Sequence, residues 1–268
     1  MNSPLRRVRH VVMDMDGTIY RGATLFPCTL PWLEFLRAHD LGFTFLTNNS
    51  SRSRQAYLDK LARLGIQVDA SQMYTSTWNT VDYLREHYPG QTRLFILGTP
   101  SLRAEMSAAG FADVEQDPDL VVVGFDTGLT YERLCRTGYW IARGKPYIAT
   151  HPDLICPTDA ETLLVDCGSI CACLSAATLR QPDQVLGKPN PAMLWPIAAR
   201  HGIQPAEMLM VGDRLQTDIL LAARAGALSC KIANPAEDGV YDHGLTVRPD
   251  FCVNHLGELQ ALMAAALT

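Results

Sequence analysis

The sequence predicts an α/β fold in which helices cover both faces of a doubly wound, mostly parallel sheet. Short, nearly continuous apolar runs predict strands that are buried from both sides, as parallel strands usually are. Helical stretches alternate with these runs along the chain, which is the pattern of βαβ units. The length of 268 residues exceeds the ~100–150 typical of one domain, so we expect two lobes or one large α/β domain.

Short apolar runs are the expected strands. They are RHVVM (9–13), FTFLT (43–47), LFILG (94–98), LVVVG (120–124), PYIAT (146–150), MLMVG (208–212) and LSCKI (228–232). Because each run is apolar at almost every position, each is expected to pack on both faces.

Helices are expected between these strands. They are YLDKLARLG (57–65), ERLCRTGYWIARG (132–144), PAMLWPIAARHG (191–202) and a closing helix, GELQALMAAALT (257–268). Asn190 is expected to cap the third, with Pro191 at its first position. A glycine follows each of several helical stretches, where the left-handed conformation past a helix end favours it. These glycines are Gly42, Gly65, Gly110, Gly202 and Gly226.

The composition argues against a nucleic-acid or membrane partner. The net charge is −5, and the longest basic run is the pair Arg6–Arg7. The apolar runs are far shorter than the ~20 residues of a membrane-spanning helix. Asp14 interrupts the apolar stretch that follows Arg9, so no signal-peptide core forms. We therefore expect a cytoplasmic protein.

The eight cysteines are expected to be reduced and buried, because most lie in apolar segments and no secretory signal precedes them. Cys167, Cys171 and Cys173 form a cluster. Its spacing does not match the zinc-finger patterns, and a metal would need a fourth ligand.

Four short segments place reactive side chains just past the ends of expected strands, where open α/β sheets bind ligands. They are VVMDMDGT (11–18), FLTNNSS (45–51), VLGKPNP (185–191) and LMVGDRLQTD (209–218).

The first segment offers two carboxylates, Asp14 and Asp16, followed by Gly17 for a tight turn and the hydroxyl of Thr18. Strand residues alternate sides while loop residues need not, so one aspartate can face a ligand and the other can swing above it. The alternative is a strand-end turn that the aspartates cap.

The second and third segments offer groups that suit an anion. Thr47, Asn48, Asn49 and the serines Ser50–Ser51 would form a cradle of hydroxyl and N–H groups at the start of a helix. Plain helix capping is the alternative. Lys188 leaves a rigid backbone between Gly187 and Pro189 and suits a fixed cation, although surface lysines beside proline are also frequent.

The fourth segment offers Asp213 and Asp218 at a strand end, where hard oxygen ligands suit Mg²⁺. Asp218 could instead complement the dipole of the following helix or brace the site.

Together these groups suit one reaction, the transfer of a phosphoryl group to a carboxylate. A phosphoryl group approaching a carboxylate nucleophile meets a repulsion on the order of 4 kcal/mol at ~4 Å for an effective dielectric of 20. Mg²⁺ held by Asp14 and Asp213, together with Lys188, would offset that repulsion, while Thr47 holds the remaining oxygens. Asp14 would form an aspartyl-phosphate, and Asp16 would protonate the leaving group and then deprotonate water.

The four segments, in this order, resemble the four motifs of the haloacid dehalogenase (HAD) superfamily of phosphohydrolases. More narrowly, DMDGTIYRG, FLTNNSS, GKPNP and VGDRLQTDI resemble subfamily IIA, which includes NagD-like nucleotide and sugar phosphatases, 4-nitrophenylphosphatases and phosphoglycolate phosphatases. The resemblance implies that Asp14 is the nucleophile and Asp16 the general acid and base. It also implies that the backbone carbonyl of Asp16 joins Asp14 and Asp213 in binding Mg²⁺, and that Thr47 and Lys188 bind the phosphoryl group.

The resemblance further implies a Rossmann-like core of residues 1–79 and 186–268, with a large inserted α/β cap at residues 80–185. A cap loop that reads the leaving group would place Gly168, Ser169 and Ile170 against the substrate, and the nearby cysteines would mainly pack a helix. The sequence departs from the family pattern at His151, where relatives usually carry Asn, and at Cys28, where Gly is usual. His151 is therefore a candidate substrate-binding residue.

The expected partner is a small phosphorylated metabolite, and an apolar face of the cap could pair two subunits. Two other classes of protein share parts of this pattern. A receiver-like phospho-switch also combines aspartates, Thr, Lys and Mg²⁺, but receivers are about half this length. A catalytically idle phosphate-binding protein is the third reading, and the presence of all the acids counts against it.

Overall fold

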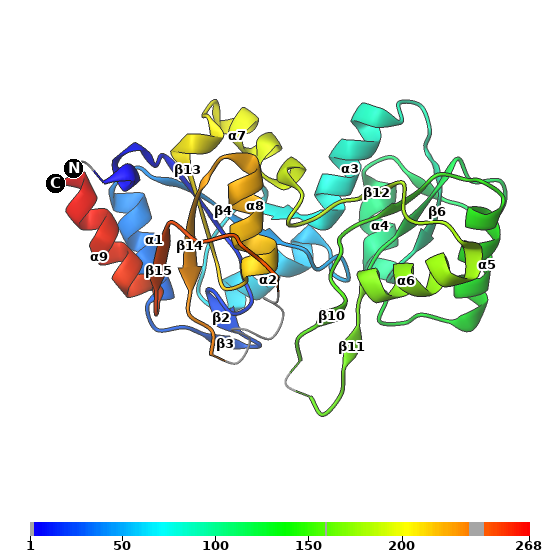
Figure 1. The fold of residues 1–268 in the computed structure, drawn as a ribbon, viewed down its shortest axis with the longest axis horizontal. Coiled ribbons are helices and arrows are strands. Elements are labelled where there is room, and N and C mark those ends of the chain that lie inside the picture. The colour runs from blue at the N-terminus through cyan, green and yellow to red at the C-terminus, as the bar shows by residue number, and fades with distance from the viewer. Residues whose placement is uncertain (1–2, 159, 236–243) are drawn as a thin grey trace. The chain divides into compact units, whose positions relative to one another are not determined.

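A computed structural model describes residues 3–158, 160–235 and 244–268, and the chain divides into two compact units. Unit 1 comprises residues 1–46, 58–73 and 188–268. Unit 2 comprises residues 47–57 and 74–187. The boundaries expected from the sequence were after residues 79 and 185. Each unit has its own sheet (Figure 1).

Unit 1 is built on a six-stranded sheet in the order β15-β14-β13-β1-β4-β5. The pairs β1–β13, β1–β4, β13–β14 and β14–β15 are all parallel. The strands are β1 (His10–Met13), β4 (Gly42–Thr47), β5 (Met73–Thr75), β13 (Met208–Gly212), β14 (Leu228–Ile232) and β15 (Phe251–Val253). A small antiparallel pair, β2 (Tyr20–Arg21) and β3 (Thr24–Leu25), follows β1.

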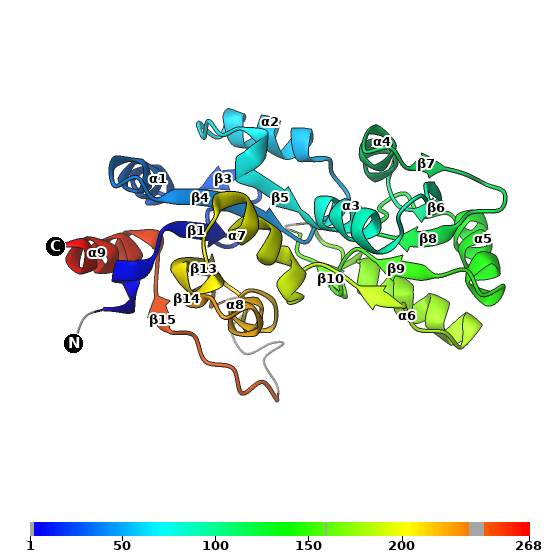
Figure 2. The same cartoon turned by 90° about the horizontal axis from the view of Figure 1, so that it is seen from above.

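Helices cover both faces of this sheet. Helices α1 (Thr29–Ala38) and α9 (Leu256–Leu267) pack against each other on one side, and α7 (Trp195–His201) and α8 (Leu220–Ala225) lie on the other (Figures 1 and 2). Helix α2 (Arg54–Arg63) begins in unit 2 and ends in unit 1. The 3₁₀ turns are Pro4–Arg7, Ala70–Gln72, Pro191–Met193 and Pro205–Glu207, and a single π-helical turn spans Leu215–Ile219.

Unit 2 is built on a five-stranded parallel sheet in the order β12-β9-β8-β6-β7. The strands are β6 (Arg93–Leu97), β7 (Ala112–Asp113), β8 (Leu120–Val123), β9 (Tyr147–Ala149) and β12 (Gln184–Val185). Helices α3 (Ser76–His87) and α4 (Pro100–Ala108) cover one face, and α5 (Tyr131–Ala142) and α6 (Cys167–Thr178) cover the other (Figure 2). An antiparallel hairpin of β10 (Ile155–Cys156) and β11 (Leu164–Val165) precedes α6.

The side-chain alternation of β6 shows why this sheet is apolar throughout. Leu94 and Ile96 pack with α3 and α4, whereas Phe95 and Leu97 pack with α5 and α6. Successive side chains of a strand point to opposite faces of the sheet, so a strand with both faces covered is stabilised by apolar residues at every position. The predicted α/β class with doubly covered parallel sheets is confirmed, and every predicted strand is present.

Two local predictions were wrong in detail. The expected helix at 191–202 is interrupted after Met193 and resumes at Trp195, because Pro196 has no N–H to donate to the preceding turn. Gly42 was expected past a helix end, yet Asp40 takes the left-handed conformation there with a φ of 53°. Gly42 instead opens β4, where a Cβ would lie 2.5 Å from Nδ1 of His10 on the neighbouring strand.

All eight cysteines are free thiols. The expectation that they are buried was too broad, since Cys135, Cys173 and Cys252 are exposed. Cys167 and Cys171 do pack in the core under α6, whereas Cys173 points away from it. Among the residues that the structure describes, no helix has the length and apolar character needed to cross a membrane.

Candidate active site

Two aspartates follow neighbouring strands at the same edge of the unit 1 sheet. Asp14 comes directly after β1 and Asp213 directly after β13, and these strands pair in parallel with Met13 opposite Val211. The N–H of Asp14 donates to the carbonyl of Val211 at 2.8 Å, which extends the ladder to the aspartate itself. Carboxylate oxygens of Asp14, Asp213 and Asp218 lie within 4.8 Å of one another.

Lys188 lies among these carboxylates. Its Nζ donates to Oδ1 of Asp14 at 2.5 Å and to Oδ1 of Asp218 at 2.7 Å. Burial alone would lower the pKa of Lys188, but Asp14 and Asp218 outweigh it and raise the pKa above its usual value. The side chain is therefore a fixed, buried ammonium, as its rigid backbone setting predicted.

Asp14 carries an excess of negative charge around it. Burial raises the pKa of its carboxyl to about 8; the ammonium of Lys188 opposes this rise, and Asp218 and Asp213 add to it. Lys188 therefore does not offset the combined effect of burial and of the two neighbouring carboxylates on this pKa. A further cation would stabilise the ionised form of Asp14, which is the form that can act as a nucleophile.

Asp218 is completely buried, and both its oxygens bond to the protein. Oδ1 accepts from Lys188, and Oδ2 accepts from the N–H of Arg214 at 3.2 Å. The π-helical turn Leu215–Ile219 places this side chain under Gly212, where a Cβ would lie 2.3 Å from its Cγ. The sequence left three roles open for Asp218, as a metal ligand, as a partner of the helix dipole or as a brace, and this geometry favours the brace.

Asp213 is held by a residue that sequence reasoning missed. Nδ2 of Asn234, just beyond β14, donates to Oδ2 of Asp213 at 2.6 Å. Arg21 in turn donates from Nη2 to Oδ1 of Asn234 at 2.8 Å. The position of Asn234 after an apolar strand was the only available signal, and a lone amide there carries little information.

The donor set fits a hard divalent cation. Carboxylate oxygens are the ligands that such ions prefer in proteins, and the cluster supplies several within reach of one another. Gly17 leaves the space beside them open, because a Cβ there would lie 2.2 Å from Oδ2 of Asp213. Asp16 lies in the turn before Gly17 with its side chain exposed.

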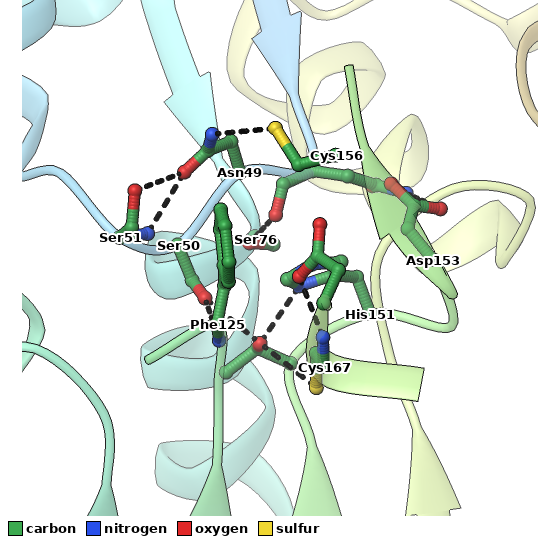
Figure 3. Close-up of polar contacts among 12 residues, drawn as sticks. Asn49, Ser50, Ser51, Ser76, Phe125, His151, Asp153, Cys156 and Cys167 are labelled. Carbon is green, nitrogen blue, oxygen red and sulfur yellow. Dashed lines mark hydrogen bonds and ion pairs between the residues drawn. The ribbon is translucent and has the colours of Figure 1, made fainter. Parts of the chain in front are cut away.

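The loop after β4 stabilises itself through its own side chains. Thr47, the last residue of β4, accepts from the N–H of Asn49 at 3.2 Å, and Oδ1 of Asn49 accepts from the N–H of Ser51 at 2.9 Å. Nδ2 of Asn48 donates to the carboxylate of Asp153 at 3.1 Å. Figure 3 shows this arrangement around Asn49 and Ser51. The hydrogen bonds of Thr47 and Asn49 stay within the loop and do not cap α2, which begins at Arg54; the hydroxyl of Ser53 accepts from the N–H of Ala56 there. Phosphate binding by Thr47, Asn48 and Asn49 stays a prediction.

Comparison with known proteins identifies the fold and its motifs. Models of haloacid dehalogenase-like and HAD-hydrolase-like domains match residues 11–112 and 185–259. The chain is 32% identical over 250 residues to human glycerol-3-phosphate phosphatase, covering 83% of this chain and 78% of that protein. It belongs to the haloacid dehalogenase superfamily. Within that superfamily, the similar solved structures place it in subfamily IIA.

Other members show the same relationship. An acid sugar phosphatase of Staphylococcus aureus is 29% identical over 223 residues, covering 83% of this chain and 85% of its own. The structure of a 4-nitrophenylphosphatase from Thermotoga maritima superposes with a TM-score of 0.90 at 39% identity, over 97% of this chain and 98% of that one. A glycerol phosphate phosphatase from Mycobacterium tuberculosis, solved in complex with calcium, gives a TM-score of 0.84 at 31% identity, over 96% and 76%.

This HAD protein is therefore an enzyme of the phosphatase class. Residues 74–187 of unit 2 contain the segment that the sequence predicts to be an inserted α/β cap, and we refer to them as the cap. The comparisons do not support the receiver-like switch or the idle binding protein considered from the sequence, because the similar proteins are phosphatases and match nearly the whole chain.

The predicted cap residues lie in two places, the first turn of α6 and the buried interior of the cap. Gly168, Ser169 and Ile170 form the first turn of α6, where Ser169 donates its hydroxyl proton to the carbonyl of Leu154 at 2.7 Å. The side chain of Ile170 is buried in the core between α6 and the sheet. His151 is completely buried, with both ring nitrogens hydrogen-bonded inside the cap, so this placement gives no support to direct contact with a substrate.

Proposed function

We propose that this enzyme is a Mg²⁺-dependent phosphomonoesterase that hydrolyses a small organic phosphate through an aspartyl-phosphate. The observation that carries the proposal is the cluster of Asp14, Asp213 and Asp218 around the ammonium of Lys188 at the end of β1 and β13. Such a cluster can accept the negative charge of a phosphate ester only together with a cation. Mg²⁺ suits it because it binds one or two carboxylates, waters and substrate phosphate together.

Asp14 and Asp213 would hold the metal, with the backbone carbonyl of Asp16 as the further ligand that the family resemblance implies. When bound, the metal supplies positive charge to the phosphoryl oxygens and lowers their repulsion for a carboxylate. Lys188 supplies a second positive charge from a fixed position. Asp218 keeps that ammonium in place, and Asn234 orients Asp213.

In the first step, one carboxylate oxygen of Asp14 attacks phosphorus, and the bond from phosphorus to the ester oxygen breaks. Asp16 gives its proton to that oxygen, so the alcohol leaves neutral. In the second step, Asp16 takes a proton from water as the water oxygen bonds to phosphorus. The bond between phosphorus and Asp14 then breaks, which releases phosphate and restores both carboxyl groups.

The substrate class is inferred from the similar proteins, whose names give glycerol 3-phosphate, sugar phosphates and 4-nitrophenyl phosphate as their substrates. These compounds share a phosphate monoester on a small alcohol or phenol. We infer the same class here. A cytoplasmic location agrees with the free thiols of all eight cysteines, which suit a reducing compartment.

Release of phosphate from 4-nitrophenyl phosphate tests the proposal. We expect turnover with Mg²⁺, loss of turnover in excess chelator, and recovery when Mg²⁺ is restored. Asp14→Asn should abolish turnover while keeping the fold, and trapping in acid should find phosphate bound to Asp14 in the native enzyme only. Full activity in Asp14→Asn would show that the covalent route is wrong. A panel of glycerol, sugar, nucleoside and glycolate phosphates would then rank the substrates.

A further inference from the structure

His151 is the buried centre of a hydrogen-bond chain inside the cap. Its side chain has no exposed surface. Nδ1 lies 2.9 Å from the hydroxyl of Thr150, and Nε2 lies 2.9 Å from Oδ1 of Asp166. Both nitrogens are therefore engaged, and the ring cannot turn without breaking two contacts.

The surrounding groups keep this ring charged. Burial alone would lower the pKa of His151, but Asp166 first, and then Cys167 and Asp153, outweigh it and raise the pKa to about 9. An imidazolium donates from both nitrogens. The hydroxyl of Thr150 must then accept from Nδ1, which leaves its own proton for the hydroxyl of Ser50 at 3.2 Å.

One end of the chain reaches the loop after β4. Ser50 is completely buried, and its hydroxyl also accepts from the N–H of Phe125 at 2.9 Å. In the same loop, Asn48 donates to the carboxylate of Asp153, two residues after His151. Residues 150–153 thus contact the loop at two points, Thr150 with Ser50 and Asp153 with Asn48.

The other end of the chain reaches the start of α6. Asp166 is the N-cap of this helix, and its Oδ1 accepts from the N–H of Cys167 at 2.6 Å as well as from His151. The N–H of Gly168 donates to the carbonyl of Asp153 at 2.8 Å. Gly168 packs directly against the backbone of Pro152, since a Cβ at residue 168 would lie 2.2 Å from the carbonyl oxygen of Pro152.

A glycine next to Lys188 packs on the same centre. A Cβ on Gly187 would lie 2.6 Å from Cβ of His151 and 2.9 Å from the carbonyl oxygen of Thr150. Gly187, the residue before Lys188, is therefore packed directly against residues 150–151, and a shift of those residues would displace it. One buried ring is linked to the loop after β4, to the start of α6 and to this segment.

We propose that His151 is a positioning residue, which fixes the first turn of α6 relative to the loop after β4 and thereby determines which leaving groups the enzyme accepts. The inference rests on the proposed function, together with the two roles that the family resemblance implies: the loop after β4 binds the phosphoryl group, and the first turn of α6 contacts the leaving group.

A metal site is the competing interpretation of the same residues, because ligand atoms of His151, Asp153 and Asp166 lie within 4.8 Å of one another. The hydrogen bonds argue against it. A ring that donates from Nε2 to Asp166 has no lone pair there for an ion, and Asp153 is held by Asn48.

Two variants and a control test the proposal. His151→Gln removes the ring and its charge, while Asp166→Asn removes the charge and keeps an oxygen that can cap α6. Tyr147→Phe is the control, because it deletes one buried cap hydrogen bond, 3.2 Å to Ser175, away from this chain. For each, kcat and KM are measured with 4-nitrophenyl phosphate and with glycerol 3-phosphate, beside the melting temperature.

We expect both variants to change the ratio of kcat/KM between the two substrates by on the order of 10–100-fold, since small misplacements of positioning groups have such effects. Tyr147→Phe should lower the melting temperature and leave the ratio within about twofold, because it removes one hydrogen bond only. If the ratio in His151→Gln and Asp166→Asn equals that of the native enzyme, the positioning role is wrong.

The pH profile of the native enzyme provides a readout that does not depend on a variant folding. The substrate ratio should shift as pH rises through about 9, where the imidazolium loses its proton, and this limb should be absent in His151→Gln. The groups facing the ring are Asp166, Asp153 and Cys167. Cys167→Ser should keep the limb and move it to lower pH, because Cys167 contributes to the raised pKa of His151, whereas a limb that belonged to the thiol would disappear. A native enzyme without metal-dependent turnover would overturn the proposed function, whereas turnover with an unshifted ratio would overturn only the role of His151.

Discussion

The amide of Asn234 donates a 2.6 Å hydrogen bond to Oδ2 of Asp213, and this contact fixes the carboxylate at the edge of the sheet. Both side chains are buried. Arg21 holds the far side of the same amide, so the orientation of Asp213 depends on a chain of two residues. Groups that orient a metal ligand in this way tune the affinity of the site.

Asn234→Ala should therefore raise the Mg²⁺ concentration needed for half-maximal activity by on the order of 10–100-fold. Arg21→Gln should have a smaller effect, since it removes only the support behind Asn234. Titration of activity with Mg²⁺ at saturating substrate measures both. An unchanged metal dependence in Asn234→Ala would mean that Asp213 does not hold the ion.

The brace formed by Asp218 gives a second prediction. Asp218→Asn removes the charge of a carboxylate that pairs with Lys188, which also contacts Asp14, so we expect a loss of stability on the order of 3 kcal/mol together with a lower kcat. The Mg²⁺ dependence should stay as in the native enzyme, because both oxygens of Asp218 already bond to the protein. Asp213→Asn is the matched comparison and should shift that dependence strongly. A similar shift in Asp218→Asn would instead make Asp218 a metal ligand.

The overall fold was readable from the sequence because its strands are buried on both faces. A run such as LVVVG is apolar at every position, which predicts a strand with both faces buried. Each such run forms a strand in the structure. The strands that were missed, among them β5, β12 and β15, are short and lie at the edges of their sheets. Such strands carry too few residues to form a pattern.

The site residues that could be predicted from the sequence are those that belong to a short local motif. Asp14 and Asp213 follow apolar strands, and Lys188 lies between a glycine and a proline. Asn234 had no such context. The role of His151 could not be read either, because its partner Asp166 is 15 residues away and its link to Ser50 spans about a hundred residues. Contacts of that kind arise only from the tertiary fold.

The close approach of Gly212 to Asp218 gives a third prediction. A Cβ at residue 212 would lie 2.3 Å from Cγ of Asp218, so Gly212→Ala should displace that side chain and Lys188 with it. We expect a loss of about 1–3 kcal/mol in stability and a large fall in kcat. Gly202→Ala is the matched control: its φ of 62° imposes a backbone strain of about 1–2 kcal/mol, and a Cβ there meets nothing within 4 Å. It should lose stability and keep its kcat, as measured by denaturation and by steady-state kinetics.

The charge on His151 makes the stability of the enzyme depend on pH. Its pKa is about 9 in the folded protein and about 6.5 in an unfolded chain, so the folded state binds more protons between these values. The stabilisation is therefore complete below about pH 6.5, declines as pH rises, and is lost above about pH 9, a change on the order of 3 kcal/mol. Urea denaturation at a series of pH values measures it.

His151→Gln isolates this effect from the other titrating groups. Its free energy of unfolding should be lower than that of the native enzyme at pH 6, where the imidazolium is present, and the gap between the two proteins should narrow toward pH 10. Asp166→Asn should behave in the same way, because the ring then loses the main partner that keeps it charged. A gap that stays constant from pH 6 to pH 10 would falsify the buried imidazolium, since a neutral ring contributes the same packing at every pH.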